Sequence, residues 1–130
     1  MFDEAGPEGE AAVIRCFGSP VRQVLQIERE YRDAVANGEC DLGVVMCGTG
    51  IGISIAANKV KGIRAAVVTD EFMAEMTRRH NNANIIALGG RVITPEKAKS
   101  LVKAWYTAEF EGGRHQKRID MITQIENEQK

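Results

Sequence analysis

Residues 42–59 have the sequence LGVVMCGTGIGISIAANK, in which an apolar run leads through a glycine-rich segment into a helix-compatible stretch. The apolar run, residues 42–46, is uninterrupted, as is typical of a strand that helices cover on both faces of a sheet. The pattern therefore predicts that a buried strand delivers Cys47 to a glycine-rich turn, and that a helix follows it to about residue 60.

The turn after Cys47 has a chemistry of its own. Backbone N–H groups at such a turn, together with the helix dipole, favour an anionic group. The same field favours the thiolate form of a cysteine, so Cys47 is a candidate base or nucleophile near neutral pH. A buried cysteine before an ordinary strand-to-helix turn has the same local sequence, and the Cys-Gly-x-Gly pattern alone leaves both interpretations open.

Length and composition narrow the class of protein. At 130 residues, the chain is expected to form one domain, residues 1–130, with a single hydrophobic core. A net charge of −1 gives no reason to expect nucleic-acid binding. No apolar run approaches the ~20 residues that span a bilayer, and the acidic N-terminus does not resemble a signal peptide. The three cysteines are irregularly spaced, which favours reduced thiols in a cytoplasmic protein.

Strands and helices are predicted to alternate along the chain. Strands are expected at residues 11–17, 42–46, 63–68 and 84–88, with helices at 20–38, 53–60, 70–80, from 95, and from 114. Residues 1–10 are expected to be loosely attached. Alternation of this kind indicates an α/β fold whose parallel sheet is covered on both faces. Ligands of such sheets bind beyond the carboxyl ends of the strands, and Cys47 lies at one of those ends.

The last predicted helix carries its charges at the unfavourable end. Arg114, His115, Lys117 and Arg118 crowd its first turn, where the helix dipole is already positive. A bound anion would reverse that cost. Arg114 and Arg118 are four residues apart, so both guanidinium groups can hold one phosphate. A solvated basic face is the alternative.

Other residues allow two interpretations each. His80 is either a surface histidine that the helix dipole stabilises or, with Asn81 beside it, part of a polar site. Arg91 is either an ordinary loop arginine or a ligand for an anion. Met73 and Met76 are expected to fill the core.

Four segments together resemble one family. They are residues 47–59 (CGTGIGISIAANK), 62–66 (GIRAA), 80–84 (HNNAN) and 111–115 (EGGRH). In this combination and order the chain resembles the type B ribose-5-phosphate isomerases and their relatives, the galactose-6-phosphate isomerase subunits. The resemblance runs from about residue 31 to the C-terminus.

The resemblance implies a Rossmann-like three-layer αβα sandwich with a mostly parallel sheet. It implies an aldose–ketose isomerase that acts on a sugar phosphate, with ribose 5-phosphate and ribulose 5-phosphate as the expected pair. It also implies a homodimer or homotetramer whose sites are shared between subunits, and it implies no metal and no organic cofactor.

The resemblance further assigns roles to individual residues. Cys47 would move a proton between C2 and C1 of the open-chain sugar, and Thr49 would orient that transfer. His80 would assist ring opening as a proton donor, and Asn81 would contact the sugar. The residues expected to bind the enediolate oxygen are Gly48, Gly50, Ile51 and Gly52, and those expected to bind the phosphate are Arg91, Arg114 and Arg118. Some relatives carry a glutamate base where this chain has Ile51, which indicates the cysteine-base type.

Residues 1–30 depart from the family pattern. Relatives begin with a strand that ends in a Cys-Asp-His-Ala-Gly-like motif, and this segment has no Asp-His pair. A truncated copy, a divergent enzyme and a longer native protein all remain open as explanations. The alternative function is a non-catalytic or partner-dependent sugar-phosphate-binding subunit.

Overall fold

The computed structural model describes residues 11–15 and 42–129 of the chain. These residues form β1 (Ala11–Arg15), β2 (Leu42–Cys47), α2 (Ile51–Ala57), β3 (Ala65–Val67), α3 (Glu71–Asn81), β4 (Ile85–Gly89), α4 (Pro95–Thr107) and α5 (Arg114–Glu128). The helix predicted at residues 20–38, the N-terminal ten residues, and Cys16 and Cys40 lie outside the described residues.

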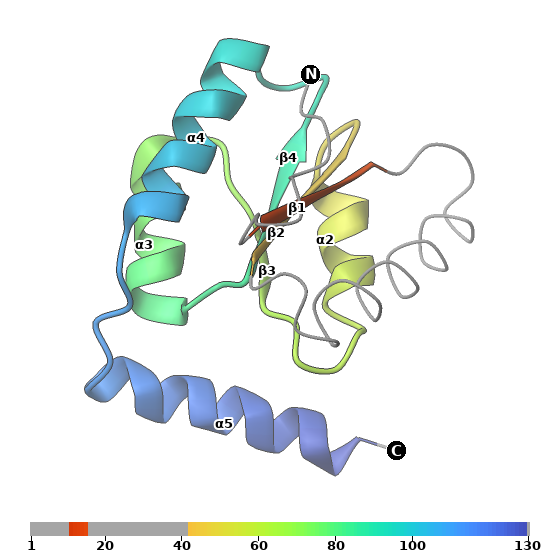
Figure 1. Cartoon of the computed structure of the whole chain (residues 1–130). Coiled ribbons are helices and arrows are strands. Elements are labelled where there is room, and N and C mark those ends of the chain that lie inside the picture. The colour runs from red at the N-terminus through yellow and green to blue at the C-terminus, as the bar shows by residue number, and fades with distance from the viewer. Residues whose placement is uncertain (1–10, 16–41, 130) are drawn as a thin grey trace.

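The strands form one parallel sheet in the order β1-β2-β4-β3. Helix α2 covers one face of this sheet, and α3 and α4 cover the other (Figure 1). The predicted α/β class and its three layers are therefore confirmed. Because β4 lies between β2 and β3, the turn after β2 and the turn after β4 emerge side by side at the carboxyl edge of the sheet.

Two cores form because successive side chains of a strand point to opposite faces of the sheet. Val45 packs against Ile53 of α2, whereas Val44 belongs to the core that contains Leu101 and Trp105 of α4. All five side chains are almost fully buried. The uninterrupted apolar run at residues 42–46 is the sequence signature of this double coverage.

Helix α3 begins as the sequence predicts, but Met73 does not lie on the face of the helix that is buried against the sheet. Asp70 caps the helix, since its Oδ1 accepts a hydrogen bond of 2.8 Å from the N–H of Met73. Met73 is 40% exposed, so its predicted role in the core is wrong. The buried face of α3 runs through Ala74 and Thr77, and Met73 lies about 100° around the helix from Ala74.

Helix α2 and strand β3 are shorter than predicted because a turn between them uses the intervening residues. Asn58 follows the end of α2, where its backbone N–H donates to the carbonyl of Ser54 at 3.0 Å. Its side chain exchanges two hydrogen bonds with the backbone of Ala65, at 2.8 and 2.9 Å. Gly62 has φ +90°, which a glycine adopts without strain. Residues 58–64 therefore form a tied loop in place of the predicted helix and strand ends.

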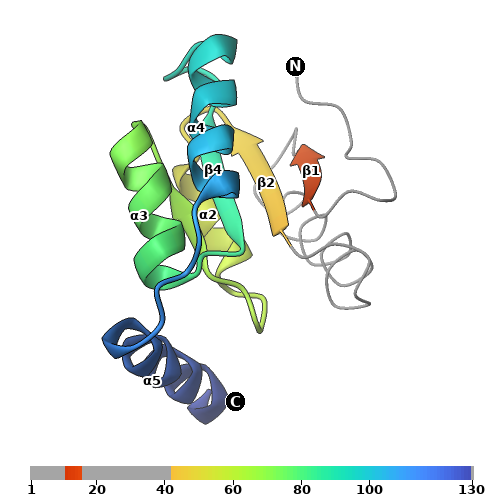
Figure 2. The same ribbon diagram turned by 60° about the vertical axis from the view of Figure 1, so that its left-hand side comes forward.

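Helix α5 lies beyond the amino ends of the strands, apart from the layers that cover the sheet (Figure 2). Of its residues, His115 and Ile119 are buried. Glu126, near its C-terminus, accepts a hydrogen bond of 2.8 Å from the N–H of Gly62. The helix is thus attached at both ends to the amino edge of the sheet.

Candidate active site

The predicted turn after β2 forms, with Cys47 as the last residue of the strand. Cys47 is partly buried, and its Sγ accepts a hydrogen bond of 3.2 Å from the N–H of Gly50. Gly50 has φ +82°, and a Cβ there would lie 2.9 Å from the carbonyl carbon of Leu88. The position therefore requires glycine for both its conformation and the space around it. The thiol is held at the mouth of the turn and is not sealed in the core.

Thr49 and the start of α2 complete this turn. Thr49 is exposed, and its Oγ1 accepts a hydrogen bond of 3.2 Å from the N–H of Ile51. The N–H groups of Gly52 and Ile53 are in the first turn of α2, where no helical carbonyl precedes them as a partner. The turn thus presents a hydroxyl group and backbone donors close to the sulfur.

Strand β4 brings Arg91 to the same turn. The N–H of Gly90 donates to the carbonyl of Cys47 at 2.8 Å, and the N–H of Arg91 donates to that of Gly48 at 2.9 Å. A Cβ built on Gly48 would lie 3.5 Å from Cδ of Arg91, so the arginine side chain passes over the turn. An exposed guanidinium and a thiol therefore share the carboxyl edge of the sheet, which can hold an anion beside a base.

His80 and Asn81 lie at the opposite, amino edge of the sheet. They form the end of α3, and β4 begins four residues after Asn81. Arg64 fixes this helix end, because its guanidinium donates to the carbonyls of Asn81 and Asn82 at 3.1 and 2.9 Å. A substrate that touched both Cys47 and His80 of one copy would have to span the sheet.

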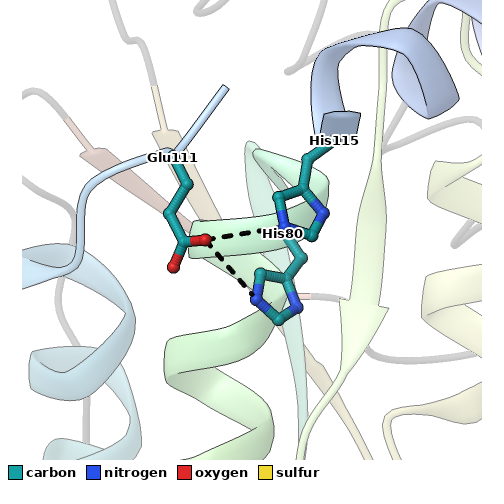
Figure 3. Close-up of side chains that lie close together, drawn as sticks. All are labelled: His80, Glu111 and His115. Carbon is teal, nitrogen blue, oxygen red and sulfur yellow. Dashed lines mark ion pairs between the residues drawn. The ribbon is translucent and has the colours of Figure 1, made fainter. Parts of the chain in front are cut away.

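The start of α5 packs against this end of α3. The rings of His80 and His115 are stacked, with centroids 4.2 Å apart and planes within 8° of parallel (Figure 3). Glu111 Oε1 lies 3.9 Å from Nε2 of His80 and 3.5 Å from Nε2 of His115. Burial lowers the pKa of His115, and the nearby His80 and Arg114 lower it further, while Glu111 opposes the shift.

The basic residues of α5 lie at the same edge. Arg114 and Arg118 are exposed, and neither has a carboxylate partner within the described part of the chain. Gly113 precedes the helix without a side-chain cap, so the charges of Arg114 and Arg118 add to the positive end of the helix dipole. These two arginines and Arg91 therefore lie at different edges of the sheet.

His80, Glu111 and His115 are residue types that bind metal ions, but their arrangement does not suit a metal site. The ligand atoms of His80, Glu111 and His115 lie within 4.8 Å of one another, and a His₂-carboxylate set can bind zinc. A metal ion lies in the plane of each imidazole that binds it. Two rings that are nearly parallel cannot both direct a nitrogen at one ion unless they turn. The arrangement suits histidines that share a carboxylate.

The sequence did not predict a site role for Glu111, His115 or Arg64, although all three lie in segments that resemble the family. The spacing of Glu111, His115 and Ile119 at four-residue intervals was the available signal, because it places them on one face if the helical pattern extends backwards. A cavity of about 920 Å³ lies under α5, and Arg64, Asn81, Ile122 and Ile125 are among its lining residues. Cys47 does not line it.

A family profile covers most of the chain. The profile of the family described as Ribose/Galactose Isomerase matches residues 20–122. The chain belongs to this family. Ribose-5-phosphate isomerase B of Escherichia coli is 55% identical over 93 residues, which are 72% of this chain and 62% of that protein. The chain thus spans less than two thirds of the length of this curated relative.

Solved structures of family members have the same fold. The ribose-5-phosphate isomerase B of Clostridium thermocellum matches with a TM-score of 0.75 and 51% identity, over 85% of this chain and 72% of that one. The enzyme of Mycoplasma genitalium, solved with bound ribulose-5-phosphate, matches with a TM-score of 0.74 and 40% identity, over 87% and 72% of the two chains. The predicted family and fold are therefore confirmed. Separately, none of the helices in residues 42–129 is both long enough and apolar enough to cross a membrane.

Proposed function

We propose that this chain is a subunit of an aldose–ketose isomerase that converts ribose 5-phosphate to ribulose 5-phosphate. The observation that carries the proposal is the partly exposed thiol of Cys47 in a turn of backbone donors, with Arg91 lying over it. A family member that binds ribulose-5-phosphate supports the choice of sugar. We place the reaction in the cytoplasm, where a free thiol stays reduced.

The turn after β2 provides the groups that proton transfer needs. The Cys47 thiolate takes the proton from C2 of the open-chain aldose, and the electron pair of that bond forms the enediolate. The same thiol returns the proton to C1, while a proton moves between the oxygens on C2 and C1, so no oxidant is consumed. Thr49 and the amides of residues 48–52 stabilise the negative oxygen as it develops.

The remaining groups come from a second copy of the chain. Strand β2 has six residues and is about 20 Å long, so the two edges of one sheet are too far apart to share one sugar phosphate. In the proposed site, Cys47 and Arg91 of one copy face His80 and Asn81 of another. Arg91 and the pair Arg114 and Arg118 then hold the phosphate from two sides, as a homodimer or homotetramer allows.

Replacement of the base tests the chemistry. Cys47→Ala is expected to lower kcat for ribose 5-phosphate by about 10²–10⁴, the usual contribution of a positioned acid or base. Formation of ribulose 5-phosphate is measured directly, with Cys47→Ser as the variant that keeps the size of the side chain. Equal turnover by Cys47→Ala and the unaltered chain would show that another residue is the base.

Mixing two inactive variants tests the shared site. Cys47→Ala and His80→Asn are each expected to be inactive, because each removes one group from every site. Co-expression at equal levels makes about half of the dimers mixed, and one of the two sites in each mixed dimer has all its groups. Activity should therefore return to about a quarter of that of the unaltered protein. No return of activity in mixed dimers would mean that both residues act within one copy.

The second candidate function is a partner-dependent subunit without activity of its own. The absence of an Asp-His pair from residues 1–30 favours it, because the family resemblance implies that such a pair contacts the sugar. Turnover by the purified chain would exclude it. Turnover that depends on adding a galactose-6-phosphate isomerase subunit would support it.

A further inference from the structure

Glu111 uses its two carboxylate oxygens for different tasks. Its Oε2 is bound by Arg79, at 2.7 Å from Nε and 2.6 Å from Nη2. Its backbone N–H also donates to the carbonyl of Arg79 at 3.0 Å. The carboxylate is therefore anchored on α3, while Oε1 is left to face His80 and His115. Figure 3 shows this oxygen directed at both rings.

The stacked rings differ in their surroundings. The side chain of His115 is 7% exposed, whereas that of His80 is 38% exposed. Two protonated imidazoles at a centroid distance of 4.2 Å would repel each other, so the stack requires at least one neutral ring. Burial lowers the pKa of His115, so this ring favours its neutral form. A fixed, uncharged ring then restricts the plane of the exposed His80 ring.

We propose that Glu111 and His115 are positioning residues, which hold the ring of His80 in the orientation that proton transfer to the sugar requires. The same carboxylate is held on α3 by Arg79, so the support for the His80 ring comes from a fixed group. The inference rests on the proposed role of His80 as proton donor. Neither Glu111 nor His115 needs to touch the substrate for this role.

Arg79 binds two glutamates, Glu111 and Glu75, and their Gln variants form a matched pair. Glu75 binds the same guanidinium, with 3.0 Å between its Oε1 and Nη1 of Arg79, but it is not paired with either histidine. Glu111→Gln is expected to lower kcat by about tenfold, part of the contribution of a general acid, with KM changed less than twofold. Glu75→Gln is expected to change both constants less than about twofold, the size of a lost surface ion pair. Equal kinetics for the two variants would overturn the positioning role.

A spectroscopic measurement separates this inference from the proposed function. In the free protein, the stacked rings should shift each other's carbon-bound protons upfield in the NMR spectrum. Glu111→Gln should weaken these ring-current shifts, and Glu75→Gln should keep them. An unaltered chain that turns over no sugar phosphate would refute the proposed function, and the spectra would still decide on the geometry. Unchanged ring-current shifts in Glu111→Gln would show that the carboxylate does not hold the rings.

Discussion

Gly89→Ala is the substitution for which the structure predicts the sharpest effect on the turn after β2. A Cβ at Gly89 would lie 2.6 Å from the carbonyl oxygen of Thr49 and 2.7 Å from its carbonyl carbon. Ordinary van der Waals contacts of a Cβ begin at 3.4 Å. The atoms in the way are backbone, so no side chain can swing aside. The turn or the end of β4 must move by about 0.8 Å to admit one methyl group.

The size of the effect follows from how firmly the turn is held. Two hydrogen bonds, from the N–H groups of Gly90 and Arg91 to the carbonyls of Cys47 and Gly48, resist the movement. We therefore expect a loss of about 3 kcal/mol in the free energy of unfolding, the upper end of the range for overpacked sites. Misplacement of reacting groups by about 1 Å can cost up to about 10²-fold in rate, so kcat should fall by one to two orders of magnitude.

Urea unfolding and the kinetics of the proposed isomerase reaction measure the two effects, with Gly90→Ala as the control. A Cβ at Gly90 would meet its nearest atom, Sδ of the flexible Met46, at 3.6 Å, which is an ordinary contact. Gly90→Ala should therefore change stability by less than about 0.5 kcal/mol. If Gly89→Ala matched Gly90→Ala in both unfolding midpoint and kcat, the tight approach of β4 to the turn would be refuted.

Two further predictions concern pH. Hydrogen bonds from Lys97 and Ser100 lower the pKa of Glu71 to about 2, so its stabilising effect should be complete above pH 4.5 and lost between pH 4.5 and 2. Glu71→Gln should therefore lower Tm at pH 7 but not at pH 2. An equal Tm of the variant and the unaltered chain at pH 7 would contradict this. The pKa of His115 is lowered from 6.5 in the folded chain, so below pH 6.5 the unfolded chain binds more protons than the folded chain. The free energy of unfolding should therefore decrease as the pH is lowered. Urea titrations at pH 7.5 and 5.5 should show a smaller loss in His115→Gln than in the unaltered chain, and equal losses would argue against a buried neutral histidine.

Local patterns in the sequence predict most of the described elements. Uninterrupted apolar runs identify β2 and β4, because side chains on both faces of these strands are buried. Helix starts are also local. Asp70 and Thr94 immediately precede α3 and α4, and the side chain of each accepts a hydrogen bond from the backbone N–H three residues onward. The prediction that Met73 fills the core was wrong because neighbouring positions on α3 lie on different faces of the helix. An apolar residue type alone does not say which face is buried.

These local patterns do not predict contacts between distant segments of the chain. Nothing in the sequence near Arg91 says that β4 pairs directly with β2, which is what brings its side chain over Gly48. Likewise, His80 stacks on His115, which is 35 residues further along the chain, because α5 packs against α3. The family resemblance selected the candidate residues, but their division between the two edges of the sheet required the three-dimensional arrangement.

That division also follows from the topology of parallel sheets. A helix that connects two parallel strands runs back against their direction, so its last turn lies at the amino edge. His80 is in the last turn of α3, and Cys47 ends a strand at the carboxyl edge. No change of loop conformation within one copy can bring the two together, because the whole sheet lies between them. If both residues act on one sugar, a second copy of the chain must therefore complete the site, and activity in the mixed dimers would show that it does.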